Sequence, residues 1–323
     1  MAIPGKYRAA VDTKSGRRMQ ADMLLLLAAL IWGVAFVAQK AALAHVGPYT
    51  FIAARFFLSA LLILPLAWRE QLNMVTDVQL FTGSNAGKLA LLCTAFSGAI
   101  IWLQLGIADT TVTSAGFLTS LYVLFVPLIG RILYGQRLSL WMVPAAILSI
   151  SGVWLLSGGT LETPAPLEKG DALVLLAAVG FALHFVLAGK LMKNVDAPYS
   201  LSCLQYCVVA LFSLFAALAR EHPDFAHIRE AWLPIIYAGA ISGAIAYTIE
   251  IVVLQYTSAT YSAVILSAEA VFAAIAGSLL MHDHLTVLKV LGCFMIICAI
   301  LFGPLPPRRH HKEKTTAKSD ESA

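Results

Sequence analysis

Two acidic residues stand inside long apolar stretches, where an uncompensated charge is costly. Glu269 lies in the sequence Ser-Ala-Glu-Ala-Val near the middle of the stretch 259–281, and Glu250 lies in the stretch 232–255. Loss of hydration favours the neutral form of an acid, which suits Glu269 to a proton-coupled or cation-sensing role. A protonated, hydrogen-bonded structural acid is an equal alternative. Glu250 fits an inner vestibule, or an acid that snorkels to the membrane interface or bonds to a neighbouring helix.

Basic, aromatic and amide side chains also lie inside the long apolar stretches. His184, in the stretch 171–190, could relay protons because histidine titrates near neutrality, but a hydrogen bond to neighbouring backbone is the favoured interpretation. Arg55, in the stretch 48–68, needs a partner: Glu269, a carboxylate substrate, or lipid headgroups reached by snorkelling. Uncharged side chains could add polar edges and aromatic walls to a cavity for an amphipathic metabolite, or pack as ordinary membrane aromatics. These candidates are Tyr122, Gln104, Gln205, Trp32 and Tyr247.

Sequence signatures of ATP-driven pumps and soluble enzymes do not occur in this chain. It contains no Walker-type Gly-Lys-Thr loop, no His-Glu-x-x-His motif and no Gly-x-Ser-x-Gly motif. The sequence His282-Asp283-His284 offers two imidazoles on a short loop, which is a weak metal site, and a solvated turn is favoured. We therefore expect no metal, no cofactor and no enzymatic activity.

The elements that position these residues are membrane helices. Of 323 residues, 59% are hydrophobic and 12% are charged, and the mean hydropathy is +0.81. Apolar runs of about 20 residues recur, each long enough to cross a hydrocarbon core of about 30 Å as a helix. The predicted spans lie near 22–43, 48–68, 88–108, 111–134, 138–157, 171–190, 197–219, 232–255, 259–281 and 286–303.

The chain repeats itself with a shift of about 150 residues. Gly47-Pro-Tyr-Thr matches Ala197-Pro-Tyr-Ser, and Ser97-Gly-Ala-Ile matches Ser242-Gly-Ala-Ile. Because each half holds an odd number of spans, the second half crosses the membrane in the opposite sense. The sequence thus predicts an all-α integral membrane fold of ten transmembrane helices, as inverted five-helix repeats over 21–158 and 170–303 around a central cavity. The repeat pairs Glu269 with Tyr122, His184 with Ala35, Arg55 with Gln205, and Glu250 with Gln104.

The loops indicate orientation. Lys and Arg are concentrated on the side that also holds the basic N-terminal tail 1–20 and the polar C-terminal tail 304–323, so both termini are predicted to be cytoplasmic and the linker 159–169 periplasmic. The C-terminal tail is expected to be disordered. The net charge of +4 is therefore a signal of topology, and the expected partner surface is the lipid bilayer, not nucleic acid.

Three residues are candidate pivots. Pro127 cannot donate a hydrogen bond to Val123 and should kink its helix beside Tyr122. Gly239 and Gly243 form a Gly-x-x-x-Gly pair that permits close helix approach. The glycine pair fits a pivot or simple packing, and packing is favoured.

Several stretches carry a family resemblance. The stretch 104–127, with Thr-Ser-Ala-Gly-Phe-Leu-Thr-Ser-Leu-Tyr, and the stretch 256–277, with Thr-Tyr-Ser-Ala-Val-Ile-Leu-Ser-Ala-Glu, resemble EamA-type members of the drug/metabolite transporter superfamily. Leu-Ile-Trp-Gly-Val-Ala-Phe, from Leu30, resembles the family's first span. Departures are Ala270, where the family usually has proline, and His282-Asp283-His284 in place of a glycine-glutamate pair.

The resemblance implies ten helices in two inverted repeats that move a small metabolite across the bacterial inner membrane by alternating access. We expect a secondary transporter of an amino acid or related amphipathic compound, working in efflux and driven by protons or by the substrate's own gradient. The alternative is an integral-membrane enzyme or lipid-handling protein that uses Glu250, Glu269 and His184 as acid or base. Oligomeric state stays open, and a homodimer is compatible with the sequence.

Overall fold

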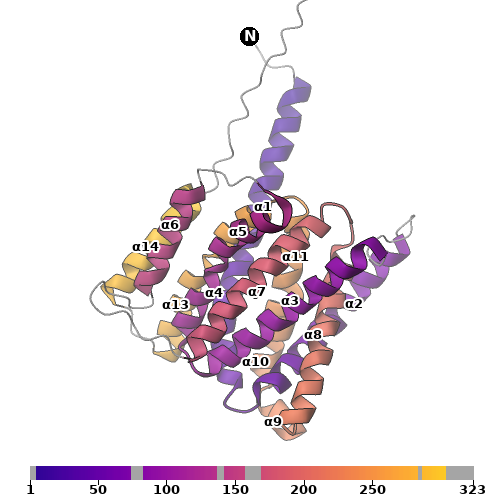
Figure 1. The fold of residues 1–323 in the computed structure, drawn as a ribbon, viewed down its shortest axis with the longest axis vertical. Coiled ribbons are helices and arrows are strands. Elements are labelled where there is room, and N and C mark those ends of the chain that lie inside the picture. The colour runs from indigo at the N-terminus through magenta and orange to yellow at the C-terminus, as the bar shows by residue number, and fades with distance from the viewer. Residues whose placement is uncertain (1–4, 74–82, 137–141, 157–168, 283–285, 303–323) are drawn as a thin grey trace, which may run out of the picture.

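The computed structural model describes residues 5–73, 83–136, 142–156, 169–282 and 286–302, and within them the chain is helical, without strands. The predicted linker 159–169, apart from Lys169, the C-terminal tail 304–323 and the pair Asp283–His284 lie outside the described residues. The helices in chain order are α1 (Gly5–Ala42), α2 (Pro48–Asn73), α3 (Gly83–Ala108), α4 (Val112–Ser120), α5 (Tyr122–Tyr134), α6 (Met142–Leu156), α7 (Lys169–Leu191), α8 (Pro198–Arg220), α9 (Phe225–Glu230), α10 (Trp232–Ile236), η2 (Tyr237–Tyr247), α11 (Thr248–Leu254), α12 (Ala259–Leu266), α13 (Glu269–Met281) and α14 (Val287–Phe302) (Figure 1).

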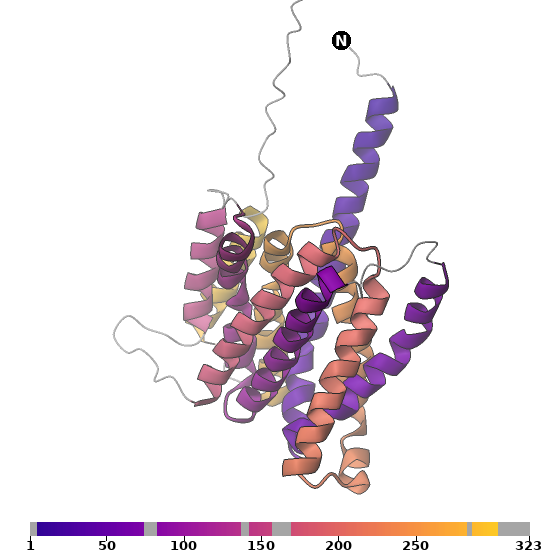
Figure 2. The same ribbon diagram turned by 45° about the vertical axis from the view of Figure 1, so that its right-hand side comes forward.

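Eight helical segments of the described residues are long and apolar enough to cross a membrane. They follow eight of the predicted spans, from Arg18–Ala42 to Ala259–Met281, and they establish an all-α membrane architecture. The remaining two predicted spans correspond to α6 and α14, of 15 and 16 described residues, which lie side by side at one edge of the bundle in Figures 1 and 2. The described helices are thus compatible with the predicted count of ten.

Helix α1 is longer than its predicted span. It begins at Gly5, so the predicted basic tail 1–20 is helical from that residue onward, and this part extends beyond the bundle in both views (Figure 2).

The two halves of the sequence are interleaved in one bundle. Helix α1 packs against α13, α2 against α8, α3 against α7, and α6 against α14. Each pair takes one helix from the first half and one from the second. This arrangement is compatible with two repeats that share a common core, and it places the large buried aromatic and aliphatic side chains between the halves.

Helices α2 and α8 cap each other. The carboxylate of Glu221, just after α8, accepts a hydrogen bond of 2.7 Å from the backbone N–H of Thr50 in the first turn of α2. The carboxylate of Glu70, near the end of α2, accepts one of 2.7 Å from the backbone N–H of Ser200 in the first turn of α8. The first turn of a helix has unpaired N–H groups and a partial positive charge, so both contacts satisfy donors and stabilise an antiparallel pair.

The predicted spans 111–134 and 259–281 are each interrupted in the middle. In the first, α4 ends at Ser120 and α5 begins at Tyr122; in the second, α12 ends at Leu266 and α13 begins at Glu269. At both interruptions a backbone N–H bonds three residues back, from Leu121 to Leu118 and from Ala268 to Ile265. These tight turns are of the 3₁₀ type.

The interruption beside Tyr122 does not coincide with Pro127, and the kink expected from that proline stays a prediction. The interruption lies at Leu121, more than one turn before Pro127, which is inside α5. The second half is interrupted at the equivalent place although it has Ala274 where the first half has Pro127. A local serine explains both cases: Ser120 Oγ donates to the Gly116 carbonyl at 2.8 Å, and Ser267 Oγ donates to the Val264 carbonyl at 2.7 Å. Such bonds from serine to its own helix bend the helix.

The predicted span 232–255 contains a π-helix, η2, between α10 and α11. Gly239 and Gly243 lie on η2 against α2, where Ser59 Oγ donates to the Gly239 carbonyl at 2.7 Å. A methyl group on Gly243 would overlap Ser59 Oγ, and one on Gly239 would lie 2.7 Å from the Arg55 carbonyl. The pair therefore serves close packing, which was the favoured interpretation.

Candidate functional site

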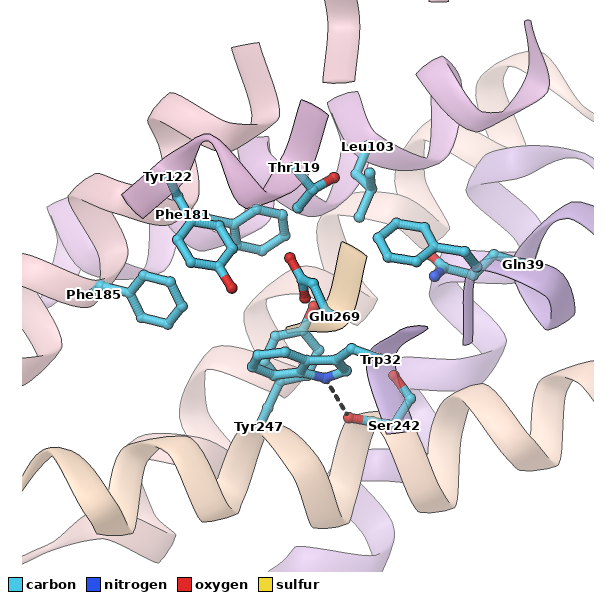
Figure 3. A pocket seen from close by; sticks show the side chains of 11 residues that line it. Trp32, Gln39, Leu103, Thr119, Tyr122, Phe181, Phe185, Ser242, Tyr247 and Glu269 are labelled. Atoms are coloured by element: carbon cyan, nitrogen blue, oxygen red, sulfur yellow. Dashed lines mark hydrogen bonds between the residues drawn. The ribbon is translucent and has the colours of Figure 1, made fainter. Parts of the chain in front are cut away.

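A cavity of about 30 Å³ lies within the bundle, where the two interrupted helices meet helices α1, α7 and η2 (Figure 3). Its lining combines aromatic, aliphatic and polar side chains: Trp32, Phe36, Gln39, Leu103, Thr119, Tyr122, Phe181, Phe185, Ser242, Tyr247 and Glu269. A volume of this size holds about two water molecules. A metabolite needs more room, so the cavity must widen before it can bind one.

Glu269 and Tyr122 point into this cavity from the first residues of α13 and α5 (Figure 3). Both side chains are buried. Ser120 Oγ lies 3.5 Å from Glu269 Oε1 and can donate to it, and the Tyr122 hydroxyl lies close enough to the Glu269 carboxyl to interact with it. The start of α13 also favours negative charge through the helix dipole. The structure thus places an acid and a phenol next to each other on one cavity.

The aromatic wall contains two of the predicted residues. Trp32 and Tyr247 have ring centroids 4.7 Å apart, and the Trp32 Nε1–H donates to the Ser242 carbonyl at 3.3 Å. On the opposite side, the ring of Phe185 meets Tyr122 edge to face at 5.0 Å. Apolar faces with a few fixed polar groups are typical of sites for amphipathic small molecules.

A second buried cluster brings together three predicted residues from three helices. His184 on α7 lies between Gln205 on α8 and Glu250 on α11: its Nε2 is 3.0 Å from Gln205 Oε1, and its Nδ1 is 3.6 Å from Glu250 Oε1. All three side chains are buried. The first contact is a hydrogen bond, and the second is an electrostatic contact too long for one. Neighbouring Tyr206 bonds to the Gly243 carbonyl at 3.1 Å, which ties this cluster to η2.

Two sequence-based interpretations are corrected here. His184 bonds to a side chain, so its favoured interpretation, a lone histidine bonded to backbone, was wrong. Glu250 does not snorkel, because its side chain is only 1% exposed, and it contacts a neighbouring helix instead. Gln104, which the repeat pairs with Glu250 and which we expect at the outer vestibule, is buried and donates to the backbone carbonyl of Gln39 at 3.4 Å.

Three partners were expected for Arg55: Glu269, lipid headgroups and a carboxylate substrate. The structure pairs it with neither of the first two. Its side chain is 2% exposed, so it does not reach lipid headgroups, and no carboxylate of the described residues lies within 4.0 Å of its guanidinium. The guanidinium instead lies over the rings of Phe56, at 4.7 Å, and Phe51, at 5.4 Å. A charge at the centre of a membrane helix costs about 2.5–3.5 kcal/mol, which these cation–π contacts offset in part.

Several residues of the cavity were not predicted. Ser120, which contacts Glu269 beside the cavity, could have been found from the repeat, because it matches Ser267 at the equivalent interruption. Phe181 and Phe185 are one helical turn apart on α7 and therefore share a face, but an apolar helix gives no signal for which face that is. Within the described residues, no cluster of three or more His, Cys, Asp or Glu side chains could hold a metal ion.

Comparisons with known proteins agree with this architecture. The model of the EamA-like transporter family matches residues 19–158 and 168–302. An uncharacterized transporter of Archaeoglobus fulgidus is 27% identical over 292 residues, which cover 90% of this chain and 87% of the relative. A probable amino-acid metabolite efflux pump of Salmonella typhimurium is 24% identical over 214 residues, which cover 66% of this chain and 68% of the relative. A solved crystal structure shares the fold with a TM-score of 0.71 at 14% identity, covering 88% of this chain and 96% of that chain.

The family match extends over most of the chain. It coincides with eight helical segments of the described residues that can cross a membrane and with a mainly aromatic cavity lined by both halves. The chain therefore belongs to the EamA-like transporter family and is a multi-pass membrane transporter of the drug/metabolite type.

Proposed function

We propose that this chain is a secondary transporter that exports a small amphipathic metabolite, an amino acid or a related compound, across the bacterial inner membrane by alternating access. The observation that carries the proposal is the cavity at the two helix interruptions, where Tyr122 and Glu269 meet an aromatic wall. The printed name of the Salmonella relative, an amino-acid metabolite efflux pump, supports the substrate class and direction.

The interrupted helices supply the binding groups. A break in the middle of a membrane helix frees backbone groups and directs a helix end at the centre of the protein, which is how many transporters build a site at mid-depth. In this chain α13 begins with Glu269 and α5 begins with Tyr122, so both side chains lie at the interruptions. Substrate binding at these ends favours widening of the cavity toward one side of the membrane, and release follows widening toward the other.

Glu269 couples this cycle to protons. Its carboxyl is buried, contacts Ser120 and Tyr122, and lies where a cationic or hydrogen-bonding part of a substrate would sit. A carboxyl that alternates between binding a proton and binding substrate makes the two movements interdependent. This gives outward substrate movement a driving force.

The remaining parts of the proposal are the topology, which follows from the loop charges, and the substrate and surroundings of the protein. The segments 21–158 and 170–303 act as the two inverted repeats, with 159–169 as an outer linker and both termini cytoplasmic. The substrate is a small molecule, the surrounding partner is the bilayer, and the substrate leaves chemically unchanged. One copy encloses its own cavity, so the proposed transport site does not require a homodimer.

The test is counterflow in liposomes. Purified protein is reconstituted, vesicles are loaded with unlabelled amino acids or related metabolites, and uptake of the labelled compound is followed. We expect accumulation of unmodified label in protein-containing vesicles, with its loss in Glu269→Ala and its retention in the control Glu230→Ala, since Glu230 is exposed on α9. A chemically modified product would support the enzyme alternative, and absence of counterflow for every compound would overturn the proposal.

A further inference from the structure

Arg55 is a buried cation with unused hydrogen-bond donors. It lies on α2 with 2% of its surface exposed, and its Nε and Nη2 atoms have no hydrogen-bond partner. The rings of Phe51 and Phe56 attract its charge but accept no conventional hydrogen bond. A guanidinium keeps its charge in proteins and offers five N–H groups in a planar fork, so much of its binding capacity is unfilled.

The protein does not supply the missing anion from its described residues. Of the two acids buried in the bundle, Glu250 contacts His184, and Glu269 lies against Ser120 in the cavity. No ion pair joins either carboxylate to Arg55. Buried charges in proteins are otherwise paired or bound to a ligand, so an unpaired buried arginine points to a ligand.

Tyr247 connects Arg55 to the cavity. Its phenol is near enough to interact electrostatically with the guanidinium, and its ring lines the cavity beside Trp32 (Figure 3). Phe56, which stacks on Arg55, lies 6.2 Å from the Tyr247 ring. The guanidinium therefore sits one aromatic layer behind the cavity wall.

The same wall is built from an uncommon helix type. Tyr247 is the last residue of η2, and π-helical turns are rare and frequently lie at functional sites. The cavity holds only about two water molecules in this conformation, so any metabolite requires a wall to move. Displacement of Tyr247 would join Arg55 to the cavity.

We propose that Arg55 is the anion subsite of the transport site and that the substrate carries a carboxylate. When Tyr247 moves aside, the guanidinium receives that carboxylate through two parallel N–H···O bonds. The apolar part of the substrate packs on Trp32 and Phe181, and its amino group meets Glu269. This inference rests on the proposed transport function, and it narrows the substrate to amphipathic amino acids and related carboxylates.

The test compares matched compounds that differ in the carboxylate alone. Proteoliposomes are assayed for counterflow of L-leucine, L-phenylalanine and related amphipathic carboxylates, and of the corresponding amides and decarboxylated amines. We expect wild type to prefer the acids by about tenfold or more in apparent affinity, because a bidentate charged pair is lost with the amide. Arg55→Gln should lose this preference because its apparent affinity falls for the acids and not for the amides and amines. Arg55→Lys, which keeps the charge without the planar fork of donors, should show an intermediate preference.

Arg229→Gln is the matched control, since Arg229 is exposed on α9 and should leave the preference unchanged. Wild-type selectivity needs no variant, so the inference stays testable if Arg55→Gln fails to fold in detergent. Equal counterflow of acids and amides by wild type, or an unchanged preference in folded Arg55→Gln, would overturn the anion subsite while leaving transport intact. Absence of counterflow for every compound would instead overturn the transport function on which the subsite depends.

Discussion

Tyr122 and Glu269 are the first residues of α5 and α13, and their side chains line the same cavity. The spacing between them in the sequence is also the spacing between Ser120 and Ser267, the serines at the two interruptions. Each half thus brings the start of one helix to the cavity, just after a serine that bonds to its own helix. The two ends differ in chemistry, since one carries a phenol and the other an acid.

Glu269→Gln tests the role of that acid. Glutamine keeps the size and hydrogen bonding of a protonated carboxyl but cannot exchange a proton. We expect counterflow by wild type to change between acidic and alkaline pH and counterflow by Glu269→Gln to stay nearly constant. The measurement is the initial rate of counterflow in proteoliposomes with the same pH on both sides. Unchanged pH dependence in the variant would show that another group, such as the Glu250–His184 pair, carries the proton.

Gly243→Ala tests the contact between η2 and α2. The added methyl group would overlap Ser59 Oγ, and overpacking of this kind costs about 1–3 kcal/mol. We expect a lower unfolding temperature in detergent and weaker transport. Gly87→Ala is the control, because a methyl group there meets no atom within 4 Å and alanine favours helix by up to about 1 kcal/mol. Equal unfolding temperatures for the two variants would mean that α2 and η2 are not tightly packed in the membrane.

Two features could be predicted from the sequence, each for a physical reason: the membrane spans, and the pairing of Tyr122 with Glu269. A helix that crosses hydrocarbon needs about 20 apolar residues, so span positions such as 48–68 are visible as composition, and α2 indeed begins at Pro48. The repeat equates Tyr122 with Glu269, and equivalent positions of interleaved halves can meet at one cavity. Such an argument requires only the order of residues along the chain.

The cluster of His184, Gln205 and Glu250 could not be predicted in this way. The three residues lie on three helices, and their contact depends on the rotation of each helix about its axis. Helix α7 is apolar on nearly all sides, so its sequence pattern leaves that rotation undetermined. The π-helix η2 is likewise invisible, because its residues form one more apolar run.

The reciprocal caps of α2 and α8 predict additive losses of stability. Removing the carboxylate in Glu70→Ala or Glu221→Ala leaves backbone N–H groups of a first turn unpaired, which costs about 1 kcal/mol each. Glu221→Ala should cost more, because its carboxylate also accepts from Thr50 Oγ1 at 2.8 Å. Since the caps lie at opposite ends of the helix pair, the double variant should lose the sum of the two within about 0.5 kcal/mol. The measurement is the free energy of unfolding of each variant in detergent. If Glu70→Ala and Glu221→Ala cost no more than the exposed control Glu230→Ala, the caps do not stabilise the helix pair.

The contact between His184 and Glu250 predicts losses of stability that are not additive, because the two side chains depend on each other. His184→Ala and Glu250→Gln each leave a buried polar group without its partner, at a cost of about 1–3 kcal/mol. The second change removes little that the first has not already removed, so the double variant should cost less than the sum by about 0.5–3 kcal/mol. His227→Ala with Asp224→Asn is the matched control, because that pair is more than half exposed and its coupling should fall below about 1 kcal/mol. Additive costs at His184 and Glu250 would show that the two groups act independently, and Glu250 would then not belong to one unit with the hydrogen-bonded pair His184 and Gln205.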